Sequence, residues 1–311
     1  MNEIKPIIKW VGGKTQILDV VFQKFPKQIS NYYEPFIGGG SVLFELLNQL
    51  EKNTLTVKTI NISDINENLI NLYNCIKDKP KKLLKILKKF KDAYDSAPIN
   101  VKNKGRTTIT PLEKLEDNIK KSKEHVYYFL RNQFNEFKNT ANKKTKRAAL
   151  FIFLNKTSFR GVYRENSSGK FNVPFGNYNS LEMFDENNII NCSVLFNKYN
   201  VTFTNSDFNA IKETITYKKD TFVYLDPPYY PENETSFTSY TSNDFNLEQH
   251  KNLVELCKHI HTKKSKFLLS NSDTKFIKDS LKDFNIQIIN LKRQINSKNP
   301  GATTNEVLIN N

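Results

Sequence analysis

The chain has 311 residues, of which 38% are hydrophobic and 25% are charged, so it can bury a core and is not intrinsically disordered. No run approaches the roughly 18 to 20 apolar residues of a membrane span, and residues 1–6 lack an apolar signal region, so we expect a soluble, cytoplasmic protein without a membrane partner. The formal net charge of +15 suits a polyanionic partner, although lysines that merely solvate the surface explain it equally well.

The cysteines do not form a disulfide or metal-binding pattern. Cys75, Cys192 and Cys257 are far apart, with no C-x-x-C pair. His259 and His261 follow Cys257 closely, but no second group of ligands completes a site. We therefore expect a reducing compartment and no bound metal.

Short apolar runs along the chain have the length and composition of β-strands. They lie at 32–36, 57–62, 201–204, 222–225, 267–269 and 286–289. Because helical stretches separate several of them, they predict parallel βαβ units in an open sheet covered on both faces, with ligands at the carboxyl ends of the strands. A last run at 307–309 is predicted to be an antiparallel edge strand.

A long lysine-rich segment lies between the second and third of these runs. Its first part has an apolar stripe with helical spacing, formed by Leu83, Leu84, Ile86, Leu87 and Phe90. Residues 100–111 have no period and predict a loop. We expect a second, mainly helical domain at 80–180, inserted into a core of 1–79 and 181–311.

A β-hairpin is predicted near the end of this segment. Residues 162–164 and 170–173 flank the sequence Asn-Ser-Ser-Gly at 166–169, which has the composition of a tight turn. Arginine and aromatic side chains would project from this ribbon.

A glycine-rich turn follows the first strand run. Gly38, Gly39 and Gly40 stand between a strand pattern and a helical pattern at 42–46. Such a turn lets a ligand approach the backbone closely, although a tight turn without a ligand has the same pattern. Leu43 replaces the third small residue of a dinucleotide fingerprint, so NAD binding is disfavoured.

Two other features suggest nucleotide binding less directly. Residues 12–15, Gly-Gly-Lys-Thr, match the end of a P-loop, but Ile8 stands where its first glycine belongs and no strand precedes it, so we reject a nucleoside triphosphatase. Asp64 ends the second strand run and suits the ribose hydroxyls of a nucleoside cofactor. It equally suits the cap of a helix that begins near Asn66.

The most specific motif is Asp226-Pro227-Pro228-Tyr229, directly after a buried strand run. The prolines stiffen the backbone and lack N–H groups, so their carbonyl oxygens can only accept. Asp226 and the Pro227 carbonyl can accept from an amino group on a ring while Tyr229 stacks on that ring, which directs the nitrogen lone pair at an electrophilic methyl group. An amine of a base inside a duplex is not reachable, so such a base must be flipped out.

These motifs resemble those of the Dam-type, alpha-group adenine-specific DNA methyltransferases over essentially the whole chain. The matching segments, in the family's order, are 9–14, 34–40, Asp64, 207–208, 226–229 and 237–240. The resemblance implies an α/β, Rossmann-like methyltransferase fold with a mixed seven-stranded sheet and an inserted, mainly helical target-recognition domain that contains the hairpin. It also implies methyl transfer from S-adenosylmethionine to N6 of a flipped-out adenine in double-stranded DNA, with GATC or a GATC-like site as the target.

The resemblance also implies roles for individual residues. The catalytic residues would be Asp226, Pro227, Pro228 and Tyr229. The cofactor-binding residues would be Trp10, Lys14, Phe36, Gly38, Gly40, Asp64, Asp207, Phe208 and Asp226. The DNA-binding residues would be Lys9, Asn155, Phe159, Arg160, Arg164 and Pro174.

Two departures from the family pattern bear on the target sequence. Dam-type proteins commonly have Asn where this chain has Arg160, and the loop at 100–111 is longer than usual. The resemblance further makes a cognate restriction endonuclease, acting on the same site, a candidate partner. We expect a monomer in solution, located wherever the genome it modifies resides.

Other activities of related proteins provide alternatives. A cytosine-C5 enzyme needs a Pro-Cys nucleophile, and no cysteine here follows proline. Cytosine-N4 enzymes more often have Ser at the position of Asp226, and RNA modifiers of related fold often have Asn, so Asp favours adenine while both alternatives stay open. A DNA-binding regulator without turnover is a further alternative, against which Lys14 and the intact 226–229 motif argue.

Overall fold

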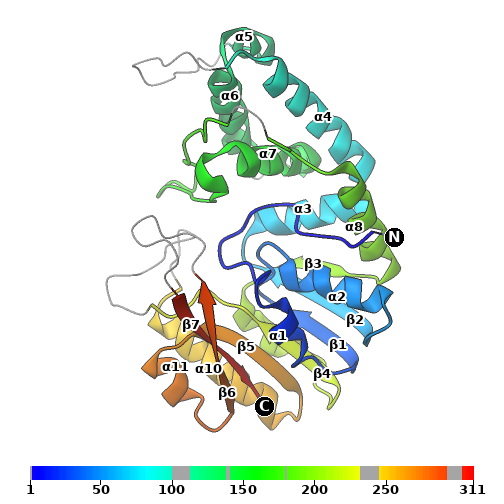
Figure 1. Ribbon diagram of the computed structural model, residues 1–311, viewed down its shortest axis with the longest axis vertical. Coiled ribbons are helices and arrows are strands. Elements are labelled where there is room, and N and C mark those ends of the chain that lie inside the picture. Colours follow the sequence, from blue (N-terminus) through cyan, green and yellow to red (C-terminus); the bar gives the residue numbers. More distant parts are fainter. Residues whose placement is uncertain (1, 100–112, 138–140, 179–180, 232–244, 293–302) are drawn as a thin grey trace. The chain divides into compact units, whose positions relative to one another are not determined.

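The computed structural model describes residues 2–99, 113–137, 141–178, 181–231, 245–292 and 303–311. The predicted loop at 100–111 and the motif at 237–240 lie outside these residues. The described chain divides into two compact units (Figure 1). We call them the helical unit, mainly Met1–Gly13 and Asn66–Lys198, and the sheet unit, mainly Lys14–Ile65, Tyr199–Ser239 and Asn243–Asn311.

The sheet unit is built on a mixed seven-stranded sheet. Its strands are β1 (Gln28–Glu34), β2 (Thr56–Asp64), β3 (Thr202–Asn205), β4 (Thr221–Leu225), β5 (Lys266–Ser272), β6 (Asn285–Lys292) and β7 (Thr303–Asn310). The strand order is β3-β2-β1-β4-β5-β7-β6. The pairs among β1 to β5 are parallel, and β7 is antiparallel to both of its neighbours, which confirms the predicted mixed α/β sheet.

The position of β7 corrects one prediction. Its antiparallel direction is as expected, but it lies between β5 and β6, so the edge strand is β6. Val307, Leu308 and Ile309 are each at most 1% exposed, whereas Ile288 of β6 is 54% exposed. A run that is buried on both faces belongs inside a sheet, and an edge strand can leave side chains in solvent.

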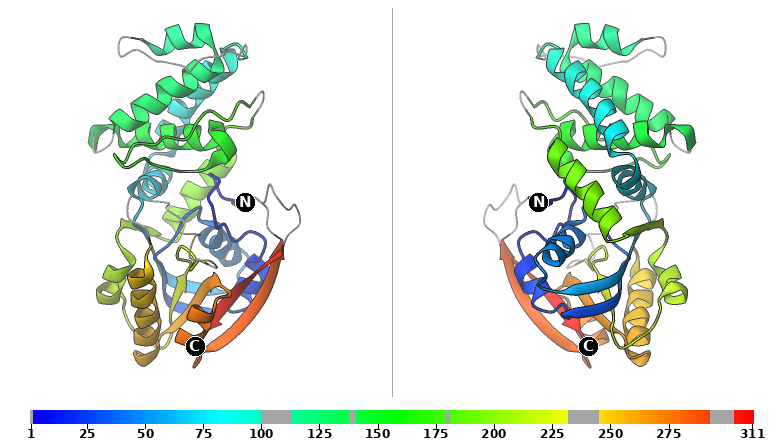
Figure 2. Two further views of the ribbon diagram at one scale, coloured as in Figure 1. Left: turned by 90° about the vertical axis from the view of Figure 1, so that its left-hand side faces the viewer. Right: turned by 90° about the vertical axis from the view of Figure 1, so that its right-hand side faces the viewer.

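Helices cover both faces of the sheet (Figure 2). The helices and short turns of this unit are α1 (Leu18–Phe22), α2 (Ser41–Glu51), η3 (Phe208–Ala210), α9 (Ile211–Thr214), α10 (Leu247–Thr262) and α11 (Lys275–Ser280). Val223 and Leu225 of β4 are buried in one cluster with Leu253 of α10. Successive side chains of a strand point to opposite faces. On the other face the ring of Phe25 accordingly lies 4.7 Å from that of Phe222.

The helical unit is organised around one buried helix. Its helices and short turns are α3 (Glu67–Asp78), α4 (Pro80–Ser96), α5 (Leu115–Lys121), α6 (Lys123–Glu136), η1 (Ala141–Lys143), α7 (Lys144–Thr157), η2 (Phe159–Gly161) and α8 (Glu186–Lys198). Residues 148–154 of α7 are each at most 2% exposed, and α3, α4 and α6 pack against this helix. A helix that is apolar all round is suited to such a central position.

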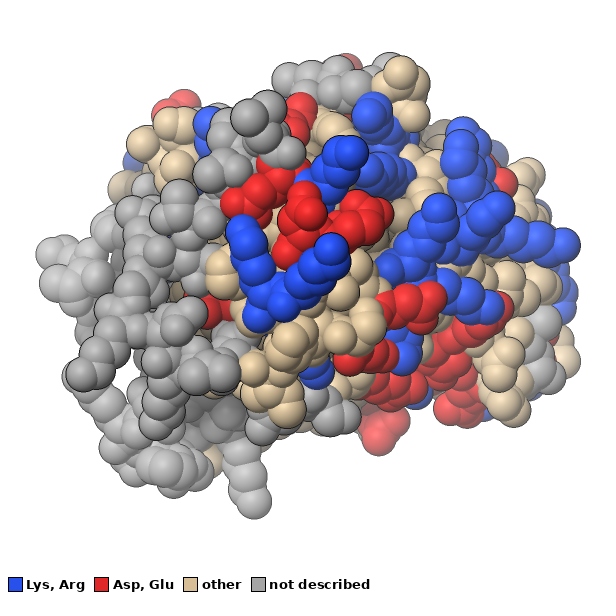
Figure 3. Space-filling model, turned by 90° about the horizontal axis from the view of Figure 1, so that it is seen from above, with Lys and Arg blue, Asp and Glu red and all other residues tan. Residues whose placement is uncertain are grey.

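Helix α4 has the predicted division between apolar and basic faces. Four members of the apolar stripe are buried, and Ile86 is half-buried. The exposed face carries Lys81, Lys82, Lys85, Lys88 and Lys89. Figure 3 shows Lys and Arg gathered on one side of the surface seen from above, interrupted by acidic side chains.

The compact helical unit is wider than the domain predicted at 80–180. It also takes in residues 1–13, α3 and α8, and α3 packs against both α7 and α8. The assignment of DNA recognition to 80–180 rests on role and stays a prediction.

The described ranges hold no helix with both the length and the apolar character needed to cross a membrane. The three cysteines are buried and form no disulfide. Among the residues placed in the structure, no group of three or more His, Cys, Asp or Glu side chains is arranged to hold a metal ion.

Candidate functional site

Three acidic residues of the sheet unit lie at the carboxyl ends of neighbouring strands. Glu34 ends β1, Asp64 ends β2 and Asp226 follows β4. These strands are adjacent and parallel, so their carboxyl ends lie together. From β1 the chain continues to β2 on one side, and from β4 it continues to β5 on the other side. This reversal makes the carboxyl ends of β1 and β4 the switch point, the place where open α/β sheets bind ligands.

The glycine turn after β1 brings main-chain amides to these strand ends. Gly38 and Gly40 have φ values of 49° and 78°, a region that favours glycine. The amide of Gly40 donates to the carbonyl of Ile37 at 2.8 Å and closes the turn before α2. The amide of Gly38 donates to Oδ2 of Asp64 at 3.0 Å, so the turn and the end of β2 are joined.

Asp64 does not cap the following helix, which removes the alternative interpretation of this residue. Asn66 is the cap of α3, and its Oδ1 accepts from the amide of Asn68 at 3.0 Å. Oδ2 of Asp64 instead accepts from the glycine turn.

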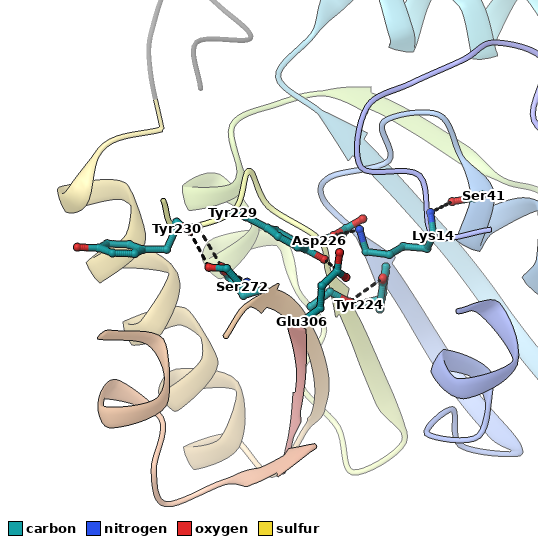
Figure 4. Close-up of polar contacts among 10 residues, drawn as sticks. Lys14, Ser41, Tyr224, Asp226, Tyr229, Tyr230, Ser272 and Glu306 are labelled. Atoms are coloured by element: carbon teal, nitrogen blue, oxygen red, sulfur yellow. Dashed lines mark hydrogen bonds and ion pairs between the residues drawn. The ribbon is translucent and has the colours of Figure 1, made fainter. Parts of the chain in front are cut away.

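A buried ion pair lies at the end of β4 (Figure 4). Nζ of Lys14 lies 2.8 Å from Oδ1 of Asp226, and the two side chains are 4% and 18% exposed. The amide of Lys14 donates to Oγ of Ser41 at 3.1 Å, which holds the lysine against the start of α2. Burial raises the pKa of Asp226, the charge and hydrogen bond of Lys14 lower it, and the charge of Glu306 raises it further. Together these effects give Asp226 a pKa of about 6. At neutral pH Asp226 is therefore a carboxylate that can accept hydrogen bonds.

Tyr229 lies beside this pair and has contacts at its ring face and at its hydroxyl. Its ring centroid lies 4.9 Å from Nζ of Lys14, and its hydroxyl donates to Oε2 of Glu306 at 2.8 Å. Pro227 and Pro228 separate Asp226 from the tyrosine and supply carbonyl groups without N–H donors. This segment therefore presents acceptors next to an aromatic ring.

A second carboxyl group, that of Glu34, is buried behind the site. Glu34 is 2% exposed and accepts from the hydroxyl of Tyr32 at 2.8 Å. The pKa of Glu34 is raised to about 8, mainly by burial. The hydrogen bond from Tyr32 lowers this pKa, and the charges of Asp226 and Asp64 raise it. Glu34 therefore keeps its proton at neutral pH.

The structure brings together the aromatic residues predicted to line the cofactor pocket. The ring centroids of Phe36 and Phe208 are 5.2 Å apart, and Phe245 packs against both. Oδ1 of Asp207 accepts from the amide of Asn209 at 2.8 Å and so caps η3, which holds Phe208 in place.

Asn155 of the helical unit joins the N-terminal segment to the predicted recognition element. Its Oδ1 accepts from the amide of Lys9 at 2.8 Å, and its Nδ2 donates to the carbonyls of Lys9 at 2.7 Å and Gly161 at 3.0 Å. Asn155 is 3% exposed, so in this structure it positions Lys9 and Gly161. Its direct contact with DNA stays a prediction.

The predicted hairpin is a ribbon held by isolated bridges. Glu165 and Phe171 form one bridge, and the amide of Asn172 donates to the carbonyl of Arg164 at 3.1 Å. Gly169, at φ 65°, completes the turn. Nε of Arg164 donates to Oδ1 of Asn172 at 2.8 Å, which orients the exposed guanidinium group on the ribbon.

The other predicted DNA contacts lie at the base of this ribbon. Phe159 is 49% exposed, and the guanidinium of Arg160 lies 5.2 Å from its ring centroid. The amide of Phe159 donates to the carbonyl of Pro174 at 2.9 Å. Phe159, Arg160 and Pro174 therefore form one local group.

Trp10 belongs to the helical unit, whereas the other predicted cofactor residues belong to the sheet unit. Its ring centroid lies 5.5 Å from that of Tyr163 and 6.2 Å from that of Phe151. The role of Trp10 in cofactor binding stays a prediction.

Two acidic residues of the site had no role in the sequence interpretation. Glu34 lies inside the matched segment 34–40, so the motif contained it without indicating its burial. Glu306 is 77 residues from Tyr229, and no local pattern connects the two.

Fold and site together define an α/β protein with an acid-proline-proline-aromatic segment at the switch point of its sheet. The chain belongs to the family described as D12 class N6 adenine-specific DNA methyltransferase, whose profile matches residues 10–295. This confirms the Dam-type resemblance: the protein is an adenine-specific DNA methyltransferase, and DNA is its substrate.

Several named relatives match over nearly their full length. The type II methyltransferase M.MjaIII of Methanocaldococcus jannaschii is 38% identical over 303 residues, which cover 95% of this chain and 94% of the relative. The DNA adenine methylase of Haemophilus influenzae is 32% identical over 300 residues, with coverage of 95% and 89%. That of Escherichia coli K12 is 30% identical over 311 residues, with coverage of 99% and 94%.

Proposed function

We propose that this enzyme transfers the methyl group of S-adenosylmethionine to N6 of an adenine flipped out of a short duplex target, GATC or a closely related site. The observation that carries the proposal is the pairing of Lys14 with Asp226 at the carboxyl end of β4, with Tyr229 alongside. Relatives named DNA adenine methylase support adenine in a Dam-like target.

The residues around the glycine turn fit S-adenosylmethionine. This cofactor supplies an electrophilic methyl group on a positively charged sulfur. The turn at Gly38 and Gly40 has no side chains to obstruct a ligand, and Asp64 at the end of β2 has the carboxylate chemistry that ribose hydroxyls require. Phe36 and Phe208 offer aromatic surface for a purine ring.

The segment after β4 fits an exocyclic amine. The Asp226 carboxylate and the Pro227 carbonyl would accept from the two N–H groups of adenine N6, which leaves the nitrogen lone pair to attack. Lys14 keeps Asp226 ionised, because its positive charge lowers the pKa that burial raises. Tyr229 would stack on the base once it has left the duplex.

Recognition of the target falls to the helical unit in this proposal. Lys9, Phe159, Arg160, Arg164 and Pro174 would contact the DNA, with Arg164 reading the two acceptors of a guanine. Asn155 would act on DNA through Lys9, whose backbone it holds. The type II methyltransferase names of relatives make a cognate restriction endonuclease a candidate partner.

Single-molecule sequencing tests the reaction and identifies the target together. DNA would be sequenced from methylation-deficient cells that express the wild type, Asp226→Ala or Asp279→Ala. Asp279 is the matched control, because its side chain is 62% exposed and pairs only with Lys275 among the described residues. We expect N6-methyladenine at one short motif with the wild type and Asp279→Ala, and none with Asp226→Ala. Absence of the mark with folded wild-type protein would contradict the proposal.

A further inference from the structure

The contact between Tyr229 and Glu306 joins the segment after β4 to the last strand. The hydroxyl of Tyr229 donates to Oε2 of Glu306 at 2.8 Å (Figure 4). Nζ of Lys14 lies 4.9 Å from the ring centroid of the same tyrosine. One contact therefore holds the far end of the ring, and the other lies against its face.

At neutral pH the Tyr229 hydroxyl is the donor of this hydrogen bond. Burial, followed by the charges of Asp226 and Glu306, raises the pKa of Tyr229 well above its usual value. The phenol keeps its proton and remains the donor. A hydrogen bond from a neutral donor to a carboxylate is stronger than one between two neutral groups.

Glu306 is held in place by the sheet on both sides. It lies on β7, where it is paired with Ser272 of β5 and Ile289 of β6. The next three residues of the strand, 307–309, are each at most 1% exposed. The carboxylate is therefore carried by a rigid interior strand, whereas Tyr229 lies on the segment that follows β4.

We propose that Glu306 is a positioning residue that fixes the direction of the Tyr229 side chain, and so the place of its ring, for stacking on the target adenine. The inference rests on the proposed function, because it assumes that Tyr229 stacks on the base. A tyrosine held only at its backbone can swing about the Cα–Cβ bond, and an anchor at the hydroxyl restricts that movement. Lys14, which lies against the ring face, restricts rotation of the ring about the Cβ–Cγ bond. Because misplacement of a reacting group slows transfer more than it weakens binding, the effect falls on the rate of methyl transfer.

A double-mutant cycle tests the proposal on the full-length enzyme. The variants are Tyr229→Phe, which keeps the ring and removes the hydroxyl, Glu306→Ala, and the two combined. The single-turnover rate would be measured with unmethylated plasmid DNA and isotopically labelled S-adenosylmethionine, beside the dissociation constant for DNA. We expect each single change to slow transfer by about tenfold, the combination to slow it by no more than about twofold further, and DNA binding to change less than about twofold.

Two further variants separate positioning from structural damage. Glu306→Gln keeps an acceptor oxygen, so we expect it to retain most of the rate even if Glu306→Ala folds poorly. Asn305→Ala removes hydrogen bonds of the neighbouring β7 residue to Asn290 and Asp273 without touching Tyr229, and should leave the rate unchanged.

Additive losses in the cycle would overturn the inference while leaving the proposed function intact, since the wild type would still methylate DNA. A full rate for Tyr229→Phe would overturn it in the same way. No methyl transfer by the wild type would contradict the proposed function, and with it the inference.

Discussion

The carboxyl group of Asp226 is subject to opposing effects within a few ångströms. Burial favours its neutral form, and the Lys14 ammonium at 2.8 Å favours the anion. Its pKa of about 6 lies just below neutral pH. A small change in the surroundings of Asp226 therefore changes how much enzyme is in the accepting form.

We predict that kcat/KM falls as the pH drops through about 6, because protonated Asp226 no longer accepts as an anion. Lys14→Gln removes the positive charge that lowers this pKa, so the acid limb of the profile should move to higher pH. Initial rates between pH 5 and 9 would measure both. An unchanged limb in Lys14→Gln would show that the titrating group is not Asp226.

The raised pKa of Glu34 predicts that the stability of the protein, rather than its activity, depends on pH. The folded-state pKa of Glu34, about 8, is above the ordinary value of 4.5, so the unfolded chain loses this proton more easily. Stability from neutral Glu34 is fully present below pH 4.5 and is lost as the pH rises through about 8. Glu34→Gln stays neutral, and its stability relative to the wild type should increase between pH 6 and 8.5. Urea unfolding at the two pH values measures the difference; a constant difference would contradict the prediction.

The ribbon at 158–175 is held by the turn at Gly169 and by two backbone bridges, one near the turn between Glu165 and Phe171 and one at its base between Ser158 and Phe175. Its two bridges are isolated, so the arginines are placed by side-chain contacts more than by a regular strand ladder. Arg164 is oriented by Asn172, and Arg160 lies against Phe159.

We expect Arg164→Ala to relax recognition at one base pair by about 1 to 3 kcal/mol, because a bidentate contact to guanine would be lost. Methylation of a set of duplexes, each varied at one position, would measure this. Lys170→Ala is the matched control, since Lys170 is an exposed basic residue of the same ribbon. Uniform weakening by Arg164→Ala across all duplexes would contradict base reading.

The junction between α7 and the ribbon has little room for a side chain. Gly161 has a φ of 69°, and an added Cβ would lie 2.9 Å from the carbonyl oxygen of Asn155 and 3.0 Å from Cδ of Lys9. We predict that Gly161→Ala lowers the free energy of unfolding by about 1 to 3 kcal/mol or more. Gly12→Ala is the control, because Gly12 has a φ of 82° with no atom within 4 Å of an added Cβ. Equal losses in urea titrations of the two variants would mean that crowding does not contribute.

At the scale of the whole molecule, the net charge of +15 has a defined consequence now that DNA is the substrate. Each neutralised phosphate releases a counterion, so the logarithm of DNA affinity should fall linearly with the logarithm of salt concentration. Filter binding between about 50 and 200 mM salt would measure the slope. Over this range, a protein that makes about 6 to 10 phosphate contacts loses about 10³- to 10⁵-fold in DNA affinity. Binding of S-adenosylmethionine should change far less. Equal salt dependence of the two ligands would argue against a phosphate-contacting surface.

The local features of this protein could be predicted from the sequence because their causes are local. The apolar run 222–225 is β4, and the acid-proline-proline-aromatic segment follows it at the sheet edge. Gly38 and Gly40 form the expected turn, and the segment with the apolar stripe at 83–90 is helical. Hydrophobic period and turn chemistry act over a few residues, so they can be recognised without knowing what lies opposite.

The pairings between segments far apart in the chain could be known only from the folded structure. The apolar composition of 307–309 was enough to predict a strand, but the place of this strand inside the sheet depends on β6, which pairs beyond it. The motif at 226–229 indicated an aromatic residue at 229, but not its Glu306 partner, 77 residues away. Asn155 likewise became a buried link to Lys9 only when α7 packed beside the N-terminal segment. Such contacts depend on which strands and helices become neighbours, and that is settled by burial of the whole core rather than by any local run of residues.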